Sequence, residues 1–249
     1  NWIKDILNDE VYLPKVMVAQ IHEANENNIV NGEYWFPNLH DTRYFFSPSA
    51  YGLEKGEGYY GHSYWLLWQM QYGISNDISV GFGTTLIGLP TSLNVKYCQE
   101  IKKNLNAALG YFWVGDLFNV TGGDENSFVN LPYTVLTTGS KEKNLSIGFG
   151  YNLQEISNSD IDAIDRIALN IGGVTRFSRR FSLVFEGWLL NIGSDEPIAL
   201  GGPGVRYYRK VNRVSAKNGA GSKTFDIQLF MSSLLDGAII PMFGASQRF

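Results

Sequence analysis

The chain contains few residues that could perform nucleophilic catalysis. A serine or cysteine nucleophile needs a base within hydrogen-bonding reach and a third group that orients the base. The only histidines are His22, His40 and His62. His62 and Ser63 are sequence neighbours, so on a strand their side chains would point to opposite faces and could not pair. Because His22 and His40 lie outside the segments with strand periodicity, we expect no catalytic residue.

The composition also disfavours metal, cofactor and nucleic-acid binding. Cys98 is the single cysteine, which excludes an intrachain disulfide and a Cys-x-x-Cys metal site. The glycine pairs at 81/83 and 148/150 are not followed by a helix, so they do not indicate phosphate-binding loops. A net charge of −4 gives no basic footprint for nucleic acid. We therefore expect no cofactor, no metal and no nucleic-acid partner.

The remaining candidates are charged side chains, and the elements that would position them are long β-strands. Residues 144–154 read N-L-S-I-G-F-G-Y-N-L-Q, with a large apolar side chain at every odd position and a small or polar one at every even position. Side chains alternate across a strand, so one face of this segment is apolar and the other is polar. The segment is about twice the usual strand length and matches the roughly 9–11 residues of a tilted transmembrane strand.

The same alternation recurs along the chain and predicts twelve strands. The first two are expected at about 43–50 and 60–72, and the last at 239–249. Hairpin connections make the sheet antiparallel, and closure into an up-and-down barrel removes its two unpaired edges. We expect an all-β protein with a transmembrane β-barrel at 39–249. A separate N-terminal segment at 1–38 is expected to be a plug or a periplasmic appendage.

Two architectures fit alternating strands. A membrane barrel turns its apolar face outward, whereas a soluble β-sandwich or lipocalin-like binding protein turns it inward. Strand length, aromatic residues toward the strand ends and the alternation of tight connections, such as 101–103, with longer ones, such as 117–127, favour the membrane barrel. In the strand at 129–138, this interpretation places Val129, Leu131, Tyr133 and Val135 on the lipid face.

The chain resembles the Gram-negative outer-membrane β-barrel family in its alternating strands, its glycine-rich lumen positions and its terminal Phe249. The segments at 34–48 and 55–60 are similar to uncharacterised outer-membrane proteins of the Bacteroidetes. The resemblance covers about residues 33–249 and carries no activity. It implies a bacterial outer-membrane location, contact with outer-membrane lipid, and other envelope proteins as candidate partners. It also implies that Phe249 belongs to the signal read by the insertion machinery.

The candidate functional residues are the charged side chains expected on the inward face of the barrel. They are Arg43, Lys96, Glu100, Asp116, Arg166, Arg176, Glu186, Arg206, Asp226 and Arg248. Their charges nearly balance, which fits either the polar lumen of a weakly selective pore or a packed ion-pair network that fills a narrow barrel. The first predicts a small-solute channel, and the second a structural subunit of an envelope complex. A membrane-embedded lipid hydrolase is the least favoured alternative.

Overall fold

The computed structural model describes residues 2–4, 10–12, 29–63, 67–117, 127–153, 166–192, 197–209, 221–236 and 238–249. The chain divides into two compact units, Asn1–Phe36 and Pro37–Phe249. His22 and most of the predicted N-terminal segment at 1–38 lie outside the described residues. The role of that segment, as a plug or an appendage, stays a prediction.

The described part of the first unit contains two short antiparallel strand pairs. In one, β1 (Trp2–Lys4) pairs with β2 (Glu10–Tyr12), and in the other β3 (Ile29–Val30) pairs with β4 (Glu33–Tyr34). The turn between β3 and β4 is Asn31-Gly32, and both residues have positive φ, 53° and 78°. Asn-Gly is a preferred pair for a two-residue hairpin turn of this kind.

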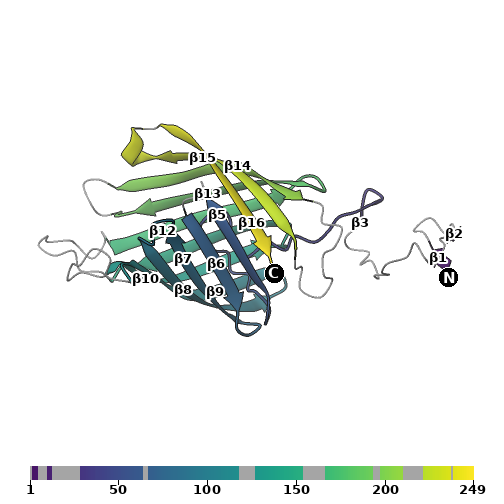
Figure 1. The fold of residues 1–249 in the computed structure, drawn as a ribbon, viewed down its shortest axis with the longest axis horizontal. Helices are drawn as coiled ribbons and strands as arrows, with labels where there is room; N and C mark the ends of the chain where they lie inside the picture. The colour runs from purple at the N-terminus through teal and green to yellow at the C-terminus, as the bar shows by residue number, and fades with distance from the viewer. Residues whose placement is uncertain are drawn as a thin grey trace, which may run out of the picture. The chain divides into compact units, whose positions relative to one another are not determined.

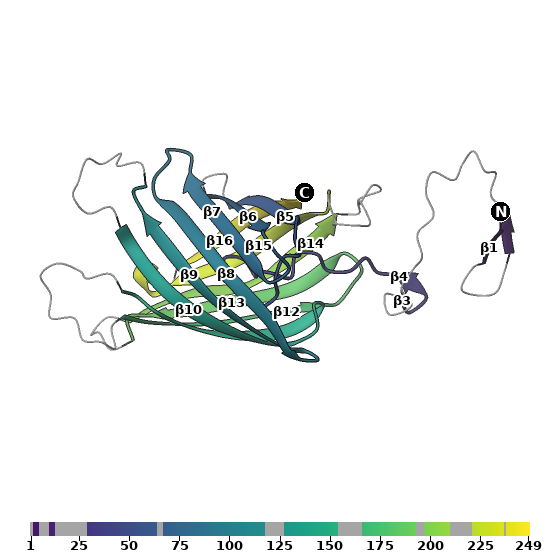
Figure 2. The same cartoon turned by 90° about the horizontal axis from the view of Figure 1, so that it is seen from below.

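The second unit is a closed antiparallel barrel of twelve described strands (Figures 1 and 2). The strands are β5 (Gly58–Ser63), β6 (Leu67–Gly73), β7 (Ile78–Thr85), β8 (Thr91–Lys102), β9 (Leu105–Gly115), β10 (Ser127–Gly139), β11 (Lys143–Tyr151), β12 (Ile167–Arg176), β13 (Phe181–Leu190), β14 (Ile198–Arg209), β15 (Lys223–Ser232) and β16 (Ile239–Arg248). Each strand pairs with its neighbour in sequence, and β16 pairs with β5 to close the ring. A short 3-10 helix, η4 (Ser233–Leu235), follows β15. The predicted all-β, closed, up-and-down fold is confirmed.

The predicted positions of the first two strands were wrong, although the count of twelve is right. Residues 43–50 do not form a barrel strand but a turn, in which the Tyr44 N–H donates to the Ser47 carbonyl at 2.9 Å. The aromatic residues from Tyr44 to Phe46 resembled the apolar positions of an alternating strand, although they fall at both odd and even positions. The predicted strand at 60–72 is instead two strands, β5 and β6. Tyr60 and Met70 are both exposed at even positions, so one continuous alternation concealed the division into two strands.

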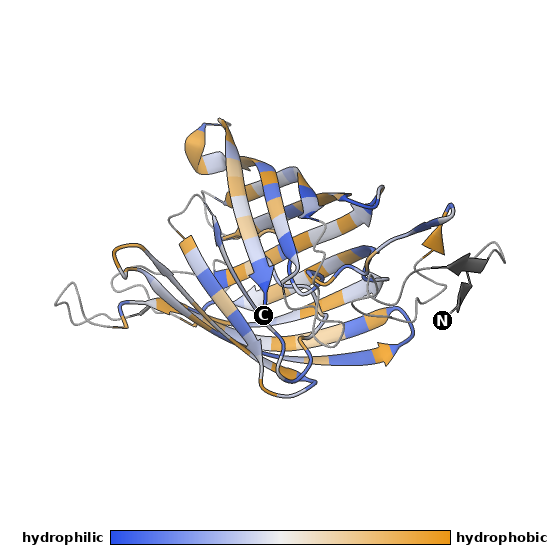
Figure 3. Cartoon of the chain, turned by 45° about the vertical axis from the view of Figure 1, so that its right-hand side comes forward, coloured by the Kyte–Doolittle hydropathy of each residue, from blue (hydrophilic) through white to orange (hydrophobic). Residues whose placement is uncertain are grey.

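The strand faces follow the predicted alternation along most of the barrel. In β11, Ser146 is 0% exposed and Ile147 is 60% exposed. Figure 3 shows the same alternation of hydrophobic and hydrophilic residues along neighbouring strands. The exposed residues of the outer surface include many large apolar ones, such as Leu109, Leu183 and Ile227. The outside of the barrel is therefore an apolar belt, which is the reverse of a soluble β-sandwich.

Strand β10 is the exception, and its predicted faces were reversed. Val135 is 1% exposed, whereas Leu136 is 54% exposed. β10 carries apolar residues at both parities, so its own sequence does not specify which face turns inward. The pairing with β11 does, because Val135 lies opposite the inward-facing Gly148. Leu131, Tyr133 and Val135 consequently line the lumen instead of facing lipid.

Connections at the two ends of the barrel differ in length. The tight-turn end carries the connections 74–77, 103–104, 140–142 and 177–180, and the link 210–222 is its long exception. The loop end carries the connections 86–90, 116–126, 152–166, 191–197, 233–238 and 64–66, of which 64–66 and 86–90 are short. Both ends of the barrel sequence meet at the tight-turn end, where the Phe249 N–H donates to the Gly58 carbonyl at 2.9 Å. No helix in the described part of the chain is long and apolar enough to span a membrane.

Candidate functional site

A segment of the chain that precedes the first barrel strand runs inside the barrel. Residues 38–53, here called the inner loop, begin at the tight-turn end, where the Asn38 side-chain amide donates to the Lys141 carbonyl at 2.8 Å. The loop turns at Tyr44–Ser47 and leaves the lumen at the same end, where the Gly73 N–H donates to the Glu57 carbonyl at 2.8 Å. Most of its residues are buried, and Ser47 is fully buried. The inner loop therefore occupies the lumen from the tight-turn end (Figure 2).

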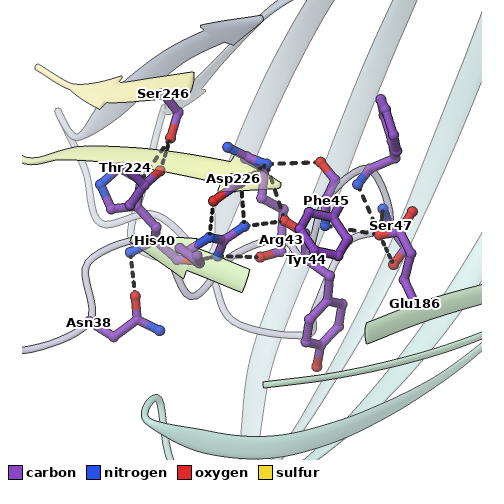
Figure 4. A network of polar contacts seen from close by, with 12 residues as sticks. Asn38, His40, Arg43, Tyr44, Phe45, Ser47, Glu186, Thr224, Asp226 and Ser246 are labelled. Atoms are coloured by element: carbon purple, nitrogen blue, oxygen red, sulfur yellow. Dashed lines mark hydrogen bonds and ion pairs between the residues drawn. The ribbon is translucent and has the colours of Figure 1, made fainter. Parts of the chain in front are cut away.

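Glu186, in the middle of β13, binds the tip of the inner loop (Figure 4). Its Oε2 accepts the backbone N–H groups of Phe45, Phe46 and Ser47 at 2.9, 2.9 and 3.0 Å, and the Ser47 hydroxyl at 3.1 Å. Three successive N–H groups in a turn form a natural anion site. A buried carboxylate is tolerated only when it is satisfied in this way. Glu186 thus fixes the depth that the tip reaches in the barrel.

An ion-pair cluster on β14 and β15 binds the loop from the side. Arg206 donates two hydrogen bonds to the Asp226 carboxylate, at 2.9 and 3.1 Å. The same guanidinium donates to the backbone carbonyls of His40, at 2.9 Å, and of Tyr44. Arg43 of the loop lies 3.7 Å from Asp226. Backbone carbonyls of the loop accept further hydrogen bonds from the Arg206 guanidinium. A buried ion pair requires such additional hydrogen bonds.

Lys96, on β8, binds the loop from the wall opposite β14 and β15, and Tyr44 of the loop contacts β11. The Lys96 ammonium donates to the carbonyls of Thr42, Ser49 and Tyr51 at 3.3, 3.0 and 2.8 Å, which uses all three of its donors. The Tyr44 hydroxyl donates to Asn144 Oδ1 at 2.7 Å on β11. These contacts show that the inner loop is bonded around much of the barrel circumference.

Further ion pairs lie at the tight-turn rim. Arg248 lies 3.2 Å from Glu57, and Arg176 lies 3.0 Å from Glu142. Lys141 lies 2.9 Å from the buried carboxylate of Asp41. The negative charge of Asp41 raises the pKa of Lys141 above its ordinary value. The Lys141–Asp41 pair binds the first part of the inner loop to the rim, and the Arg248–Glu57 pair binds the segment that follows the loop.

His40 lies between two serine hydroxyls, 3.1 Å from Ser246 Oγ and 3.2 Å from Ser222 Oγ. The side chain is 3% exposed, and both ring nitrogens are engaged in these contacts. Burial lowers its pKa well below the ordinary value, and the nearby Arg206 lowers it further. His40 does not line the barrel cavity that a substrate could enter. The Ser246–His40 distance would suit a nucleophile and base, but this environment is that of a packed structural residue.

A cavity of about 340 Å³ occupies the lumen beyond the tip of the inner loop. Phe46 and Pro48 of the loop line it, and so do Val114 and Trp188, which lie near the loop-end termini of β9 and β13. It therefore lies on the loop-end side of the inner loop. Its lining is mostly apolar, with Phe112, Leu131 and Tyr133 on one wall. The inner loop and this cavity together are the candidate site.

The structure gathers some of the ten sequence-predicted residues and separates others. Arg43, Lys96, Glu186, Arg206 and Asp226 surround the inner loop, as described above. Arg176 and Arg248 lie at the tight-turn rim. Glu100 is exposed near the end of β8, beside a register shift, rather than in the lumen. Asp116 is buried just after β9 at the loop end, and Arg166 is half-buried just before β12.

Sequence reasoning missed the two features that define the site. The inner loop was assigned to a barrel strand, although Pro48 and the aromatic run from Tyr44 to Phe46 were signals against a regular strand. The apolar wall of the cavity was missed because Leu131 and Tyr133 were placed outward. Phe112, an inward aromatic that follows the small or polar inward residues Asn106, Ala108 and Gly110, was the available signal.

The barrel has the fold of an outer-membrane porin. A solved structure of the KdgM porin in complex with disordered oligogalacturonate superimposes with a TM-score of 0.50 at 8% sequence identity, covering 78% of this chain and 98% of that one. The NanC porin gives a TM-score of 0.46 at 10% identity, covering 76% and 97% of the two chains. Omp33 of Acinetobacter baumannii gives 0.38 at 12% identity, covering 80% and 100%.

These likenesses concern the fold alone. No protein-family model matches the chain, and no curated protein matches it. The comparisons do not show a relationship with Bacteroidetes proteins.

Proposed function

We propose that the chain is a bacterial outer-membrane barrel that admits small solutes, and that the inner loop closes its lumen at the tight-turn end. The apolar belt of the barrel supports a surround of outer-membrane lipid. The closed ring of strands leaves no unpaired backbone edge to face hydrocarbon, as a membrane-spanning sheet requires.

The cavity is the observation that carries the solute-binding part of this proposal. Protein interiors are packed almost without voids larger than a water molecule. A barrel that served only as a packed support would be filled in the same way. The cavity of about 340 Å³ instead falls within the size range of small-molecule sites. The lumen is therefore filled at one end and hollow toward the other.

A structural subunit of an envelope complex is the second candidate, and the inner loop is the observation that favours it. Glu186, Arg206 and Lys96 fix the loop by buried hydrogen bonds, and these must break before a solute can pass. A barrel whose loop never moves would act as a closed scaffold with other envelope proteins as partners.

Solute flux into lipid vesicles distinguishes the two candidates. Residues 39–52 would be replaced by a flexible Gly-Ser linker of about six residues, which can span roughly 20 Å. The barrel strands and their backbone pairing stay intact in this variant. We expect vesicles with the shortened chain to take up small uncharged solutes several-fold faster than vesicles with the intact chain. Equal and negligible uptake by both would contradict the channel and favour the scaffold.

A further inference from the structure

The exposed lining of the cavity is mostly apolar, and its charged groups make contacts with the inner loop and the barrel wall. Among the described residues, Arg43 and Lys96 are the charged side chains that line it. Lys96 spends its three donors on backbone carbonyls, and Arg43 contacts Asp226 and donates to the Phe45 carbonyl at 2.8 Å. The Lys96 ammonium therefore has no donor left for an anionic solute. A sugar would place many hydroxyl groups against carbon, where they would lose their hydrogen bonds with water.

Two amide atoms in the cavity wall lack hydrogen-bond partners. Asn170, on β12, is 6% exposed and lines the cavity, and its Nδ2 has no acceptor in the described chain. Asn94, on β8, also lines the cavity, and its Oδ1 has no donor. The Nδ2 of Asn94 donates to the Tyr133 hydroxyl at 3.4 Å. Buried polar groups are nearly always satisfied, so these atoms offer a donor and an acceptor to a molecule in the cavity.

Glycines on β11 make the space in which Asn170 lies. Asn170 pairs with Gly148 across β11 and β12. A Cβ atom at Gly148 would lie 1.8 Å from Asn170 Oδ1, and one at Gly150 would lie 3.0 Å from the Leu131 side chain. Any other residue at these positions would displace the amide or fill the cavity. The inward face of β11 therefore keeps both the volume and the unpaired amide.

We propose that the cavity binds a small, uncharged and mainly apolar molecule that carries a carbonyl or hydroxyl oxygen, and that Asn170 Nδ2 donates a hydrogen bond to that oxygen. The carbon skeleton lies against Phe112, Leu131 and Pro48, where apolar contact drives binding. The proposal rests on the proposed function, since it names the class of solute that the same lumen takes.

Calorimetric titration of the full chain in detergent, with three small probes, tests this proposal. Acetophenone is uncharged, apolar and carries one acceptor; ethylbenzene has nearly the same shape without the acceptor; galacturonate is charged and polar. Partition of the apolar probes into detergent is the same for every variant, so differences between variants report the cavity. We expect the intact chain to bind acetophenone, to bind ethylbenzene more weakly, and not to bind galacturonate.

Asn170→Leu removes the donor and keeps the side chain's size. We expect it to weaken acetophenone binding about tenfold and to leave ethylbenzene binding unchanged, which shows that the cavity is intact. Leu131→Trp fills the cavity and should abolish binding of both apolar probes, with a heat-modifiable band on a gel as the check of folding. Equal acetophenone affinity of the intact chain and N170L would overturn the role of Asn170. Absence of acetophenone binding, or preference for galacturonate, would overturn the solute class.

The outcome can be separated from that of the proposed function. If vesicles with the shortened chain take up solutes but the intact chain binds no apolar probe, the proposed channel function is supported and the proposed solute class is wrong. If acetophenone binds through Asn170 but neither chain passes solute, the cavity is a binding site in a closed barrel.

Discussion

Glu186 accepts both the backbone N–H and the hydroxyl of Ser47, at 3.0 and 3.1 Å, in the middle of the barrel lumen. The two residues are 139 positions apart in the sequence, and Ser47 is fully buried. This contact joins the tip of the inner loop to the barrel wall. The boundary between the filled and the hollow parts of the lumen therefore lies at the level of Glu186, in the middle of β13.

Removing the Glu186 carboxylate should loosen the loop tip. Glu186→Ala leaves three buried backbone N–H groups and one hydroxyl without their acceptor. We expect the free energy of unfolding to fall by about 3 kcal/mol, because unsatisfied buried donors lose their full solvation. Urea unfolding in detergent measures this change. Glu100→Ala is the matched control, since Glu100 is exposed, and it should change stability by less than about 0.5 kcal/mol.

The ion pair of Arg206 and Asp226 should behave as a coupled unit. Asp226→Ala leaves the buried Arg206 with only backbone acceptors, so we expect it to cost about 3–5 kcal/mol. The double variant Arg206→Met/Asp226→Ala should cost less than the sum of the two single changes. A double-mutant cycle of unfolding free energies gives this coupling. Strictly additive costs would show that the pair does not act as one unit.

Acid should destabilise the inner loop through His40. Burial and the charges of Arg206, Arg43 and Arg248 depress its pKa in the folded chain, below the ordinary value of 6.5. A histidine with a depressed pKa contributes stability that is fully present above 6.5 and is lost as the pH falls below 6.5, because the unfolded chain then binds the extra proton. We expect the free energy of unfolding to fall between pH 7 and pH 5 more steeply in the intact chain than in His40→Gln. Parallel pH profiles of the two chains would contradict this role.

Tyr44 requires a glycine opposite it on β12. A Cβ atom at Gly172 would lie 2.4 Å from the Tyr44 ring, and the ring cannot move away easily because its hydroxyl is bonded to Asn144 and Ser146. We expect Gly172→Ala to destabilise the barrel by about 1–3 kcal/mol, as overpacking does. Gly187→Ala is the control, since its Cβ would lie 3.6 Å from Ile171, an ordinary contact. A similar change in stability for both variants would exclude the steric explanation.

The fold was predictable from sequence where one strand face is consistently apolar. β11 is the clearest case, because Leu145, Ile147 and Phe149 face outward and Ser146 faces inward, as its alternation predicts. β10 was not predictable in the same way, since it is apolar at both parities and its register is set by the neighbouring strand. The pairing of Val135 with the inward-facing Gly148 identifies the inward face of β10.

The sequence predicted that the charged residues of the site turn inward, but it did not predict which groups they bind. Alternation predicted that Glu186, Arg206 and Asp226 turn inward, because large apolar residues such as Phe185, Val205 and Ile227 occupy the other parity. Their partners are backbone groups of the inner loop, which no periodicity reveals. A loop that folds back inside a barrel has no repeating pattern of its own, so its position depends on long-range contacts such as that between Asn38 and Lys141.

Single-channel recording in planar bilayers tests most directly whether the inner loop closes the lumen. The intact chain and the chain with residues 39–52 replaced by the Gly-Ser linker would be compared at the same voltage and salt. We predict that the intact chain gives little or no current and that the shortened chain gives stable steps of defined conductance. Equal conductance of the two chains, or no current from a correctly folded shortened chain, would contradict this account.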